Sequence, residues 1–167
     1  NSTVEGMTID GSAGTTTTAD FGADSSDVTV TGGTGAVTIT GTGDVNGLTV
    51  DASNSTGVAT LGVAFATGSS NVEITTGDAT GAVTIGGNVA VTGLTLDASN
   101  HGGTGAIGVT TGDTSSGVDI TLGADAGALT ATGGAGVAGD ITVSSLQAIG
   151  AGVTAYETVT IAANCNG

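Results

Sequence analysis

Three aspartates occupy the same place in three similar stretches of the chain, and they are the first candidates for chemistry. Asp10, Asp51 and Asp97 each follow a segment that alternates aliphatic residues with threonine, and each precedes a turn. One interpretation is an Asx turn, in which the carboxylate accepts backbone N–H bonds where a strand ends. The other is a row of oxygen ligands for Ca²⁺ between repeats. A fourth such stretch, in the third full repeat, has Ser144 at this place, which interrupts such a row.

Other residues suited to chemistry are scarce. His101 is the single histidine, and it replaces Ser55 of the preceding repeat, so we expect a surface position in a loop. Cys165 is the single cysteine, which leaves either a free thiol or a disulfide to another chain. Zinc sites and catalytic triads need several such groups close together. We therefore expect a protein that is not an enzyme and has no cofactor, apart from the calcium considered above.

The composition limits the partners. The 167 residues include no Lys or Arg and 15 Asp plus Glu, for a formal charge of −15. Nucleic-acid phosphates cannot be neutralised without cationic side chains, and anionic membrane surfaces repel such a chain. No apolar run approaches the ~20 residues of a membrane-spanning helix, so we expect neither nucleic-acid binding nor membrane insertion.

Several features suggest an extracellular location. The sequence starts at Asn1 without an initiator methionine, as a mature product does after its leader is removed. Asn1 and Asn54 each begin a triplet that matches the N-glycosylation acceptor pattern. An oxidising extracellular setting would also allow Cys165 to bridge two subunits.

An internal repeat of 46 residues organises the chain. Residues Gly35–Gly62 and Gly81–Gly108 are identical at 16 of 28 positions, and a weaker third copy begins at Gly127. A repeat of this kind decides the fold more firmly than any single residue does. We divide a single β domain, 1–167, into a partial repeat with connector and three repeats: 1–26, 27–72, 73–118 and 119–164. The acidic residues Asp27, Glu73 and Asp119 fall in one column of this alignment.

Short segments that alternate aliphatic residues with threonine recur about every 11 residues and are typical of strands. No segment has a convincing helical pattern, so the prediction is an all-β protein. Four strands per repeat fit a β-solenoid or an extended β-sandwich or meander. Three repeats are too few blades to close a propeller.

The C-terminal segment 153–163 has strong strand propensity, but Glu157 falls on its apolar face. Such a strand is suited to completing the sheet of a neighbouring subunit, where Cys165 could lock the contact. The alternative is a frayed tail.

Three GGxG sequences, starting at Gly32, Gly102 and Gly133, resemble the calcium-binding nonapeptide of RTX β-rolls. Their acidic position holds Val37, Ile107 and Ala138, so calcium binding in that mode is excluded. The Thr-, Gly- and Asp-rich phrases also resemble repeats of bacterial surface-layer proteins and secreted adhesins. The lack of Lys, Arg and Pro is similar to that of amyloid-like sheath and filament proteins, such as methanogen sheath proteins.

These resemblances imply a secreted structural subunit that self-assembles through β-sheet pairing into a filament, sheath or surface layer. Its main partner is then itself. The alternative is a monomeric binding module, such as an adhesin stalk or a glycan- or ice-binding solenoid. The last idea rests on Thr29, Thr38 and Thr49 with their repeat equivalents, whose ladders would resemble the ice-binding face of insect antifreeze solenoids.

Overall fold

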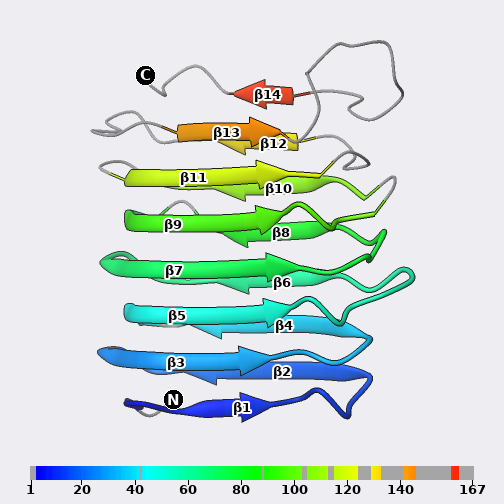
Figure 1. Ribbon diagram of the computed structural model, residues 1–167. Coiled ribbons are helices and arrows are strands. Elements are labelled where there is room, and N and C mark those ends of the chain that lie inside the picture. Colours follow the sequence, from blue (N-terminus) through cyan, green and yellow to red (C-terminus); the bar gives the residue numbers. More distant parts are fainter. Residues whose placement is uncertain are drawn as a thin grey trace.

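The computed structural model describes residues 3–41, 43–87, 89–102, 105–112, 115–123, 129–132, 141–145 and 159–161. These residues form strands and turns, and no helix. The strands build two parallel sheets of seven strands each, stacked as a ladder with β1 at one end and β14 at the other (Figure 1). The odd-numbered strands form sheet A and the even-numbered strands form sheet B. An odd-numbered strand and the even-numbered strand that follows it make one rung.

Sheet A consists, in spatial order, of β1 (Thr8–Asp10), β3 (Ser25–Thr31), β5 (Val45–Ala52), β7 (Ser69–Thr76), β9 (Val91–Ala98), β11 (Ser116–Leu122) and β13 (Ile141–Ser145). Sheet B consists of β2 (Thr16–Phe21), β4 (Ala36–Gly41), β6 (Leu61–Ala64), β8 (Val83–Gly86), β10 (Ile107–Thr110), β12 (Leu129–Thr132) and β14 (Val159–Ile161). Every neighbouring pair is parallel, as the β5–β7 and β4–β6 pairs illustrate.

The protein is therefore an all-β parallel solenoid. This confirms the solenoid alternative, and an antiparallel sandwich or meander is wrong for this chain. Parallel pairing needs a crossover between successive strands of one sheet. Here the crossover is the strand of the opposite sheet, so the chain returns to the first sheet one strand further along the stack. The described residues contain no helix long and apolar enough to cross a membrane.

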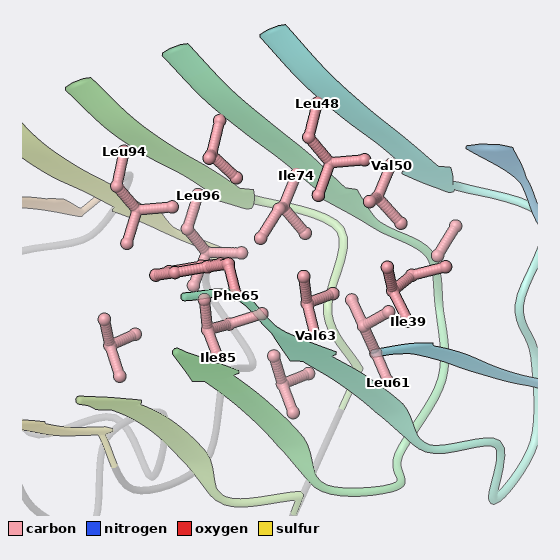
Figure 2. Close-up of a cluster of buried hydrophobic side chains, with 14 of the residues drawn as sticks. Ile39, Leu48, Val50, Leu61, Val63, Phe65, Ile74, Ile85, Leu94 and Leu96 are labelled. Atoms are coloured by element: carbon pink, nitrogen blue, oxygen red, sulfur yellow. The ribbon is translucent and has the colours of Figure 1, made fainter. Parts of the chain in front are cut away.

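The core lies between the two sheets, because alternate residues of each strand point inward. Figure 2 shows Leu48, Val50 and Ile74 of sheet A facing Val63 and Ile85 of sheet B. All five side chains are at most 2% exposed. Fully burying an aliphatic side chain of this size contributes about 1.5–3 kcal/mol, so the columns of Val, Leu and Ile are the main source of stability.

Larger core side chains are placed where a neighbouring rung is small. Phe65 is 4% exposed and lies in the core amid the aliphatic side chains (Figure 2). The register of β4 with β6 puts Gly41 at the same position one rung earlier. Phe21, 1% exposed, pairs with Gly41 from the other side. This alternation lets a narrow interior accommodate aromatic rings.

The 46-residue sequence repeat spans two rungs. In sheet B, Val37 pairs with Leu61 and Leu61 pairs with Val83, which lies 46 residues after Val37. Gly35 and Gly81 share one setting, because a Cβ at either would collide with the carbonyl oxygen of the preceding rung, at Thr15 and Ala59 respectively.

One predicted column is wrong. Glu73 pairs with Thr49, and Thr49 pairs with Thr29, so Asp27 lies two residues away from the Glu73 column. Its equivalent in the fourth rung is Asn71. The reason is a difference in rung length, since Thr49 follows Thr29 by 20 residues whereas Glu73 follows Thr49 by 24.

A column of left-handed residues bends the strands of sheet A. It consists of Gly6 (φ 61°), Asp27 (51°), Gly47 (77°), Asn71 (53°), Gly93 (69°) and Gly117 (62°). Glycine and asparagine are the residues that tolerate this conformation best. The bend interrupts the alternation of in and out, so that Ser25 is buried while Ser26 and Asp27 both face outward. At this bend the chain passes from the corner between the two sheets into the strand.

Candidate functional surfaces

The three aspartates predicted as Asx-turn or calcium residues form Asx turns. In each case the carboxylate Oδ1 accepts the backbone N–H of the serine two residues later. The bonds join Ser12 to Asp10 (3.0 Å), Ser53 to Asp51 (3.0 Å) and Ser99 to Asp97 (2.9 Å). Hydrogen bonds from the Ser12 side chain and backbone lower the pKa of Asp10. Each carboxylate therefore forms a turn at the C-terminal end of its own strand of sheet A.

The structure does not bring these carboxylates together. Asp51 pairs with Thr75, and Thr75 pairs with Asp97, so the two aspartates stand two strands apart. At about 4.8 Å per strand, that separation is roughly 10 Å. Ca²⁺ holds its oxygen ligands at about 2.3–2.6 Å, so one ion cannot contact both. No group of three His, Cys, Asp or Glu residues that could hold a metal occurs in the described part of the chain. Calcium binding at Asp10, Asp51 and Asp97 stays a prediction.

Acidic residues are concentrated on sheet A. Each strand from β1 to β11 carries one of them: Asp10, Asp27, Asp51, Glu73, Asp97 and Asp119. From Asp51 to Asp119 they alternate between two columns, because Glu73 pairs with Thr95 rather than with Asp97. Neighbouring acids are then about 8 Å apart along a diagonal, close to the screening length at physiological salt. This zigzag reduces like-charge repulsion on the acidic face.

The outer face of sheet B differs sharply. Asp20 in β2 is the one acidic residue among its seven strands. The outward positions from β4 to β12 hold threonine, glycine and alanine. Along the central column the residues alternate strand by strand: Thr38, Gly62, Thr84, Gly108 and Thr130. We call this surface the Thr/Gly face.

The Thr/Gly face is corrugated. A groove of about 170 Å³ crosses it at β6, where Gly62 and Ala64 lie between Thr38 and Thr84. A Cβ at Gly62 would meet no atom within 4 Å, so the groove is open at this point. Thr38 and Thr84 are exposed on either side of it. The alternation of threonine and glycine thus makes ridges on β4 and β8 and a groove between them.

The predicted surface position of His101 is wrong. His101 is 2% exposed, and neither ring nitrogen has a hydrogen-bond partner among the described residues. Burial lowers its pKa, and the backbone of Gly105 opposes this shift to a smaller extent. The turn geometry explains the difference. The N–H of His101 donates to the Ala98 carbonyl (3.1 Å), just as the N–H of Ser55 donates to the Ala52 carbonyl (2.9 Å), and this turn directs both side chains inward.

Ser55 satisfies that inward position better than His101 does. Its hydroxyl donates to the carbonyl of Gly35 at 3.1 Å and lies 3.4 Å from that of Gly33. The histidine ring instead places two nitrogen atoms where no described residue forms a hydrogen bond with them. A buried polar atom without a partner is costly, so His101 is a weak point of its rung.

A set of buried serines lies at the corners between the sheets and was not predicted from the sequence. The Ser69 hydroxyl donates to the Ala66 carbonyl (2.8 Å) and accepts the N–H of Val45 in the preceding rung (3.1 Å). Ser115 does the same with Gly112 (2.9 Å) and Val91 (3.1 Å). The signal was available, because Ser69 and Ser115 are 46 residues apart.

The threonine ladder proposed for ice binding is interrupted. Thr29 and Thr49 stand side by side on sheet A, but the next residue of their column is Glu73. Thr38 belongs to sheet B, where Gly62 separates it from Thr84. No continuous threonine ladder therefore runs through either of these columns.

Of the predicted modification sites, Asn54 lies in an exposed turn after β5, so its glycosylation stays a prediction. Asn1 and Cys165 lie outside the described residues. Part of the C-terminal segment 153–163 is described, and there Val159–Ile161 pairs with β12 of the same chain. These three residues therefore belong to sheet B of their own chain, and the pairing of their other edge with a neighbouring subunit stays a prediction.

No protein-family model matches the chain, and neither a curated protein nor a solved structure matches it. The function is therefore proposed from the surfaces of the solenoid. Two of them stand out: the outer edge of β1, with which no described residue pairs, and the uncharged Thr/Gly face.

Proposed function

We propose that the protein is a secreted structural subunit that self-assembles by adding the first rung of one copy to the last rung of another. The resulting extracellular polymer would be a filament, sheath or surface layer. The observation that carries the proposal is the free edge of β1. β1 pairs with β3, and no described residue pairs with its other edge.

The hydrogen-bonding groups of that edge can be assigned. The Met7 carbonyl accepts the N–H of Thr29 (2.8 Å), and the N–H of Gly11 donates to the Thr31 carbonyl (2.8 Å). Alternate residues of a strand direct their backbone groups to opposite neighbours. Thr8 therefore directs its N–H and C=O away from β3, toward the position of an added strand. Edges of this kind are normally protected by Lys, Pro or a covering segment, and this chain has no Lys or Pro.

The register positions at the two ends are compatible. Continuing the columns of sheet A beyond β13 places Thr8 of the next copy after Thr142, and Asp10 after Ser144. Continuing sheet B beyond β14 places Thr18 after Thr160. No acidic residue then follows another within these columns. This matters because each copy has a charge of −15 and no cationic side chain to compensate it.

A proline in the free edge tests the proposal. Thr8→Pro removes the N–H that points toward the added strand, while the N–H bonds to β3 are retained. We expect the wild-type protein to form polymers in light scattering and negative-stain microscopy once salt screens its charge, and Thr8→Pro to stay monomeric with unchanged circular dichroism. Thr8→Val, which keeps the N–H, is the matched control and should polymerise.

Polymerisation of Thr8→Pro to the wild-type extent would contradict assembly through β1. A wild-type protein that stays monomeric at every salt concentration would favour the alternative, a monomeric binding module.

A further inference from the structure

We propose that the Thr/Gly face of sheet B is a second self-association surface, on which a second copy of this chain packs with the same face in a ridge-into-groove fit. The inference deepens the proposed function, because it names a lateral contact that would join stacked subunits side by side. It does not require end-to-end stacking, because two single copies can already pack together through their Thr/Gly faces.

Charge selects this face for contact between copies. Two copies that met through sheet A would bring together the acids of the zigzag, such as Asp51 and Glu73, with no Lys or Arg to compensate them. Removing uncompensated carboxylates from water is strongly unfavourable. From β4 to β14 the strands of sheet B contain no acidic residue. The Thr/Gly face can therefore be buried against a copy of itself without this cost.

Shape makes the face complementary to itself. Its central column reads Thr, Gly, Thr, Gly, Thr, and this order is the same in both directions. A shift of one strand, about 4.8 Å, places the threonines of one copy over the glycines of the other. The reversed order allows a two-fold axis, which is the commonest symmetry of contacts between identical chains.

The groove has room for the ridge. A cavity of about 150 Å³ accommodates benzene, which has six heavy atoms. The groove over Gly62 measures about 170 Å³, and a threonine side chain has three heavy atoms. Thr84 of the second copy, together with a neighbouring side chain of the same face, would therefore fill it. Close packing of small uncharged side chains between two sheets is the arrangement found in steric zippers.

The area of the face predicts a weak contact between single copies. Five strands at about 4.8 Å each and about four residues per strand at about 3.3 Å each span roughly 24 Å by 13 Å, or about 300 Å² per copy. This is less than half of what a stable pair of proteins usually buries on each side. Subunits already stacked end to end would present many such faces in a row, and their contacts would add. Lateral pairing should therefore follow axial growth.

Filling the grooves tests the proposal without disturbing the fold. Gly62→Val and Gly108→Val place side chains outward, where Gly62 has no atom within 4 Å and the nearest atom to Gly108 is 3.8 Å away. Valine also has a higher strand propensity than glycine, so the double variant should fold at least as well as the wild type. Thr95→Val, at an exposed position of sheet A, is the matched control.

We expect wild-type and Thr95→Val polymers to appear as laterally paired or bundled filaments in electron microscopy, and Gly62→Val/Gly108→Val polymers to appear as single ones. A spin label at Thr84→Cys in a Cys165→Ser background gives a second measurement. When the two Thr/Gly faces are packed together, the sheets lie about 10 Å apart and are offset by one strand. The Cα atoms of residue 84 in the two copies are then about 11 Å apart. The label pair should give a short distance that the double variant abolishes.

Each outcome decides between the two proposals. Single wild-type filaments without the short label distance would overturn the lateral contact and leave end-to-end assembly intact. Side-by-side pairs that are lost in the double variant, without any filaments, would support the lateral contact and overturn end-to-end assembly. Bundles that persist unchanged in the double variant would overturn the lateral contact, and a wild-type protein that stays monomeric at every concentration would overturn both.

Discussion

The corner serines offer the sharpest test of how one rung supports the next. Ser69 is 1% exposed, and its hydroxyl is the acceptor for the N–H of Val45, a residue that is itself 2% exposed. Ser69→Ala removes that acceptor and admits no replacement, since water does not reach the site. A buried donor left without a partner costs about 1–3 kcal/mol.

The same change at Ser115 should cost a similar amount, because its hydroxyl accepts the N–H of Val91 in the same way. The two corners are two rungs apart, roughly 10 Å, so the two losses should add to about 2–6 kcal/mol. For a chain of this size, each kcal/mol lowers the melting temperature by about 2–4 °C.

Urea unfolding followed by circular dichroism, under low-salt conditions that keep the protein monomeric, would measure these losses. Hydrogen exchange would localise them, since the Val45 amide should lose protection in Ser69→Ala and the Val91 amide should not. Ser53→Ala is the control, because Ser53 is exposed and its change should stay within about 0.5 kcal/mol. If Ser69→Ala is as stable as Ser53→Ala, the corner hydrogen bond does not support the rung.

Three further predictions concern charge and backbone conformation. Burial lowers the pKa of His101 below its ordinary value of 6.5. Below about pH 6.5 the unfolded chain therefore binds a proton at His101 more readily than the folded chain does, and the stability of the fold should decrease as the pH falls. His101→Ser, which restores the residue found at Ser55, should flatten that part of the stability–pH profile, and an unchanged slope would mean that His101 is not its source. Polymer yield, measured by sedimentation, should rise with salt or Ca²⁺ and as the pH falls toward about 4, because each change reduces repulsion between acidic subunits; indifference to all three would place the carboxylates far from every contact. Gly93→Ala should destabilise the fold by about 1–2 kcal/mol because Gly93 has a φ of 69°, whereas Gly62→Ala, at an open position without this strain, should not.

Much of the fold was predictable because its determinants are local. Alternation of aliphatic residues with threonine identified the strands, and the inward positions Val28, Val50 and Ile85 follow from it directly. The Asx turn at Asp51 was likewise predictable, since a carboxylate two residues before a serine can reach its N–H without any help from the rest of the chain.

The pairing of columns between rungs was not predictable from the 46-residue repeat alone. Each repeat contains two rungs, and the rungs differ in length. The 46-residue spacing therefore aligned Asp27 with Glu73, whereas in the structure Thr29 pairs with Thr49 and Thr49 pairs with Glu73. Register depends on how many residues each turn contains, and loops tolerate such changes at little cost.

The burial of His101 was missed for a related reason. A polar residue in a turn is usually exposed, but this turn directs its fourth residue after the aspartate inward, as Ser55 also demonstrates with 5% exposure. The scarcity of acidic residues on the outer face of sheet B was visible only once the strands had been assigned to two sheets. From the sequence, its Thr and Gly residues look the same as those of sheet A.

The central claim is that copies add along the solenoid axis and continue both sheets. Helical reconstruction of the polymer by electron cryomicroscopy tests it most directly. Seven strands per sheet at about 4.8 Å each predict an axial rise of about 34 Å per subunit, with the 4.8 Å strand spacing parallel to the polymer axis. A polymer whose strand spacing runs perpendicular to its axis, or whose subunits meet without continuing the two sheets, would contradict the claim.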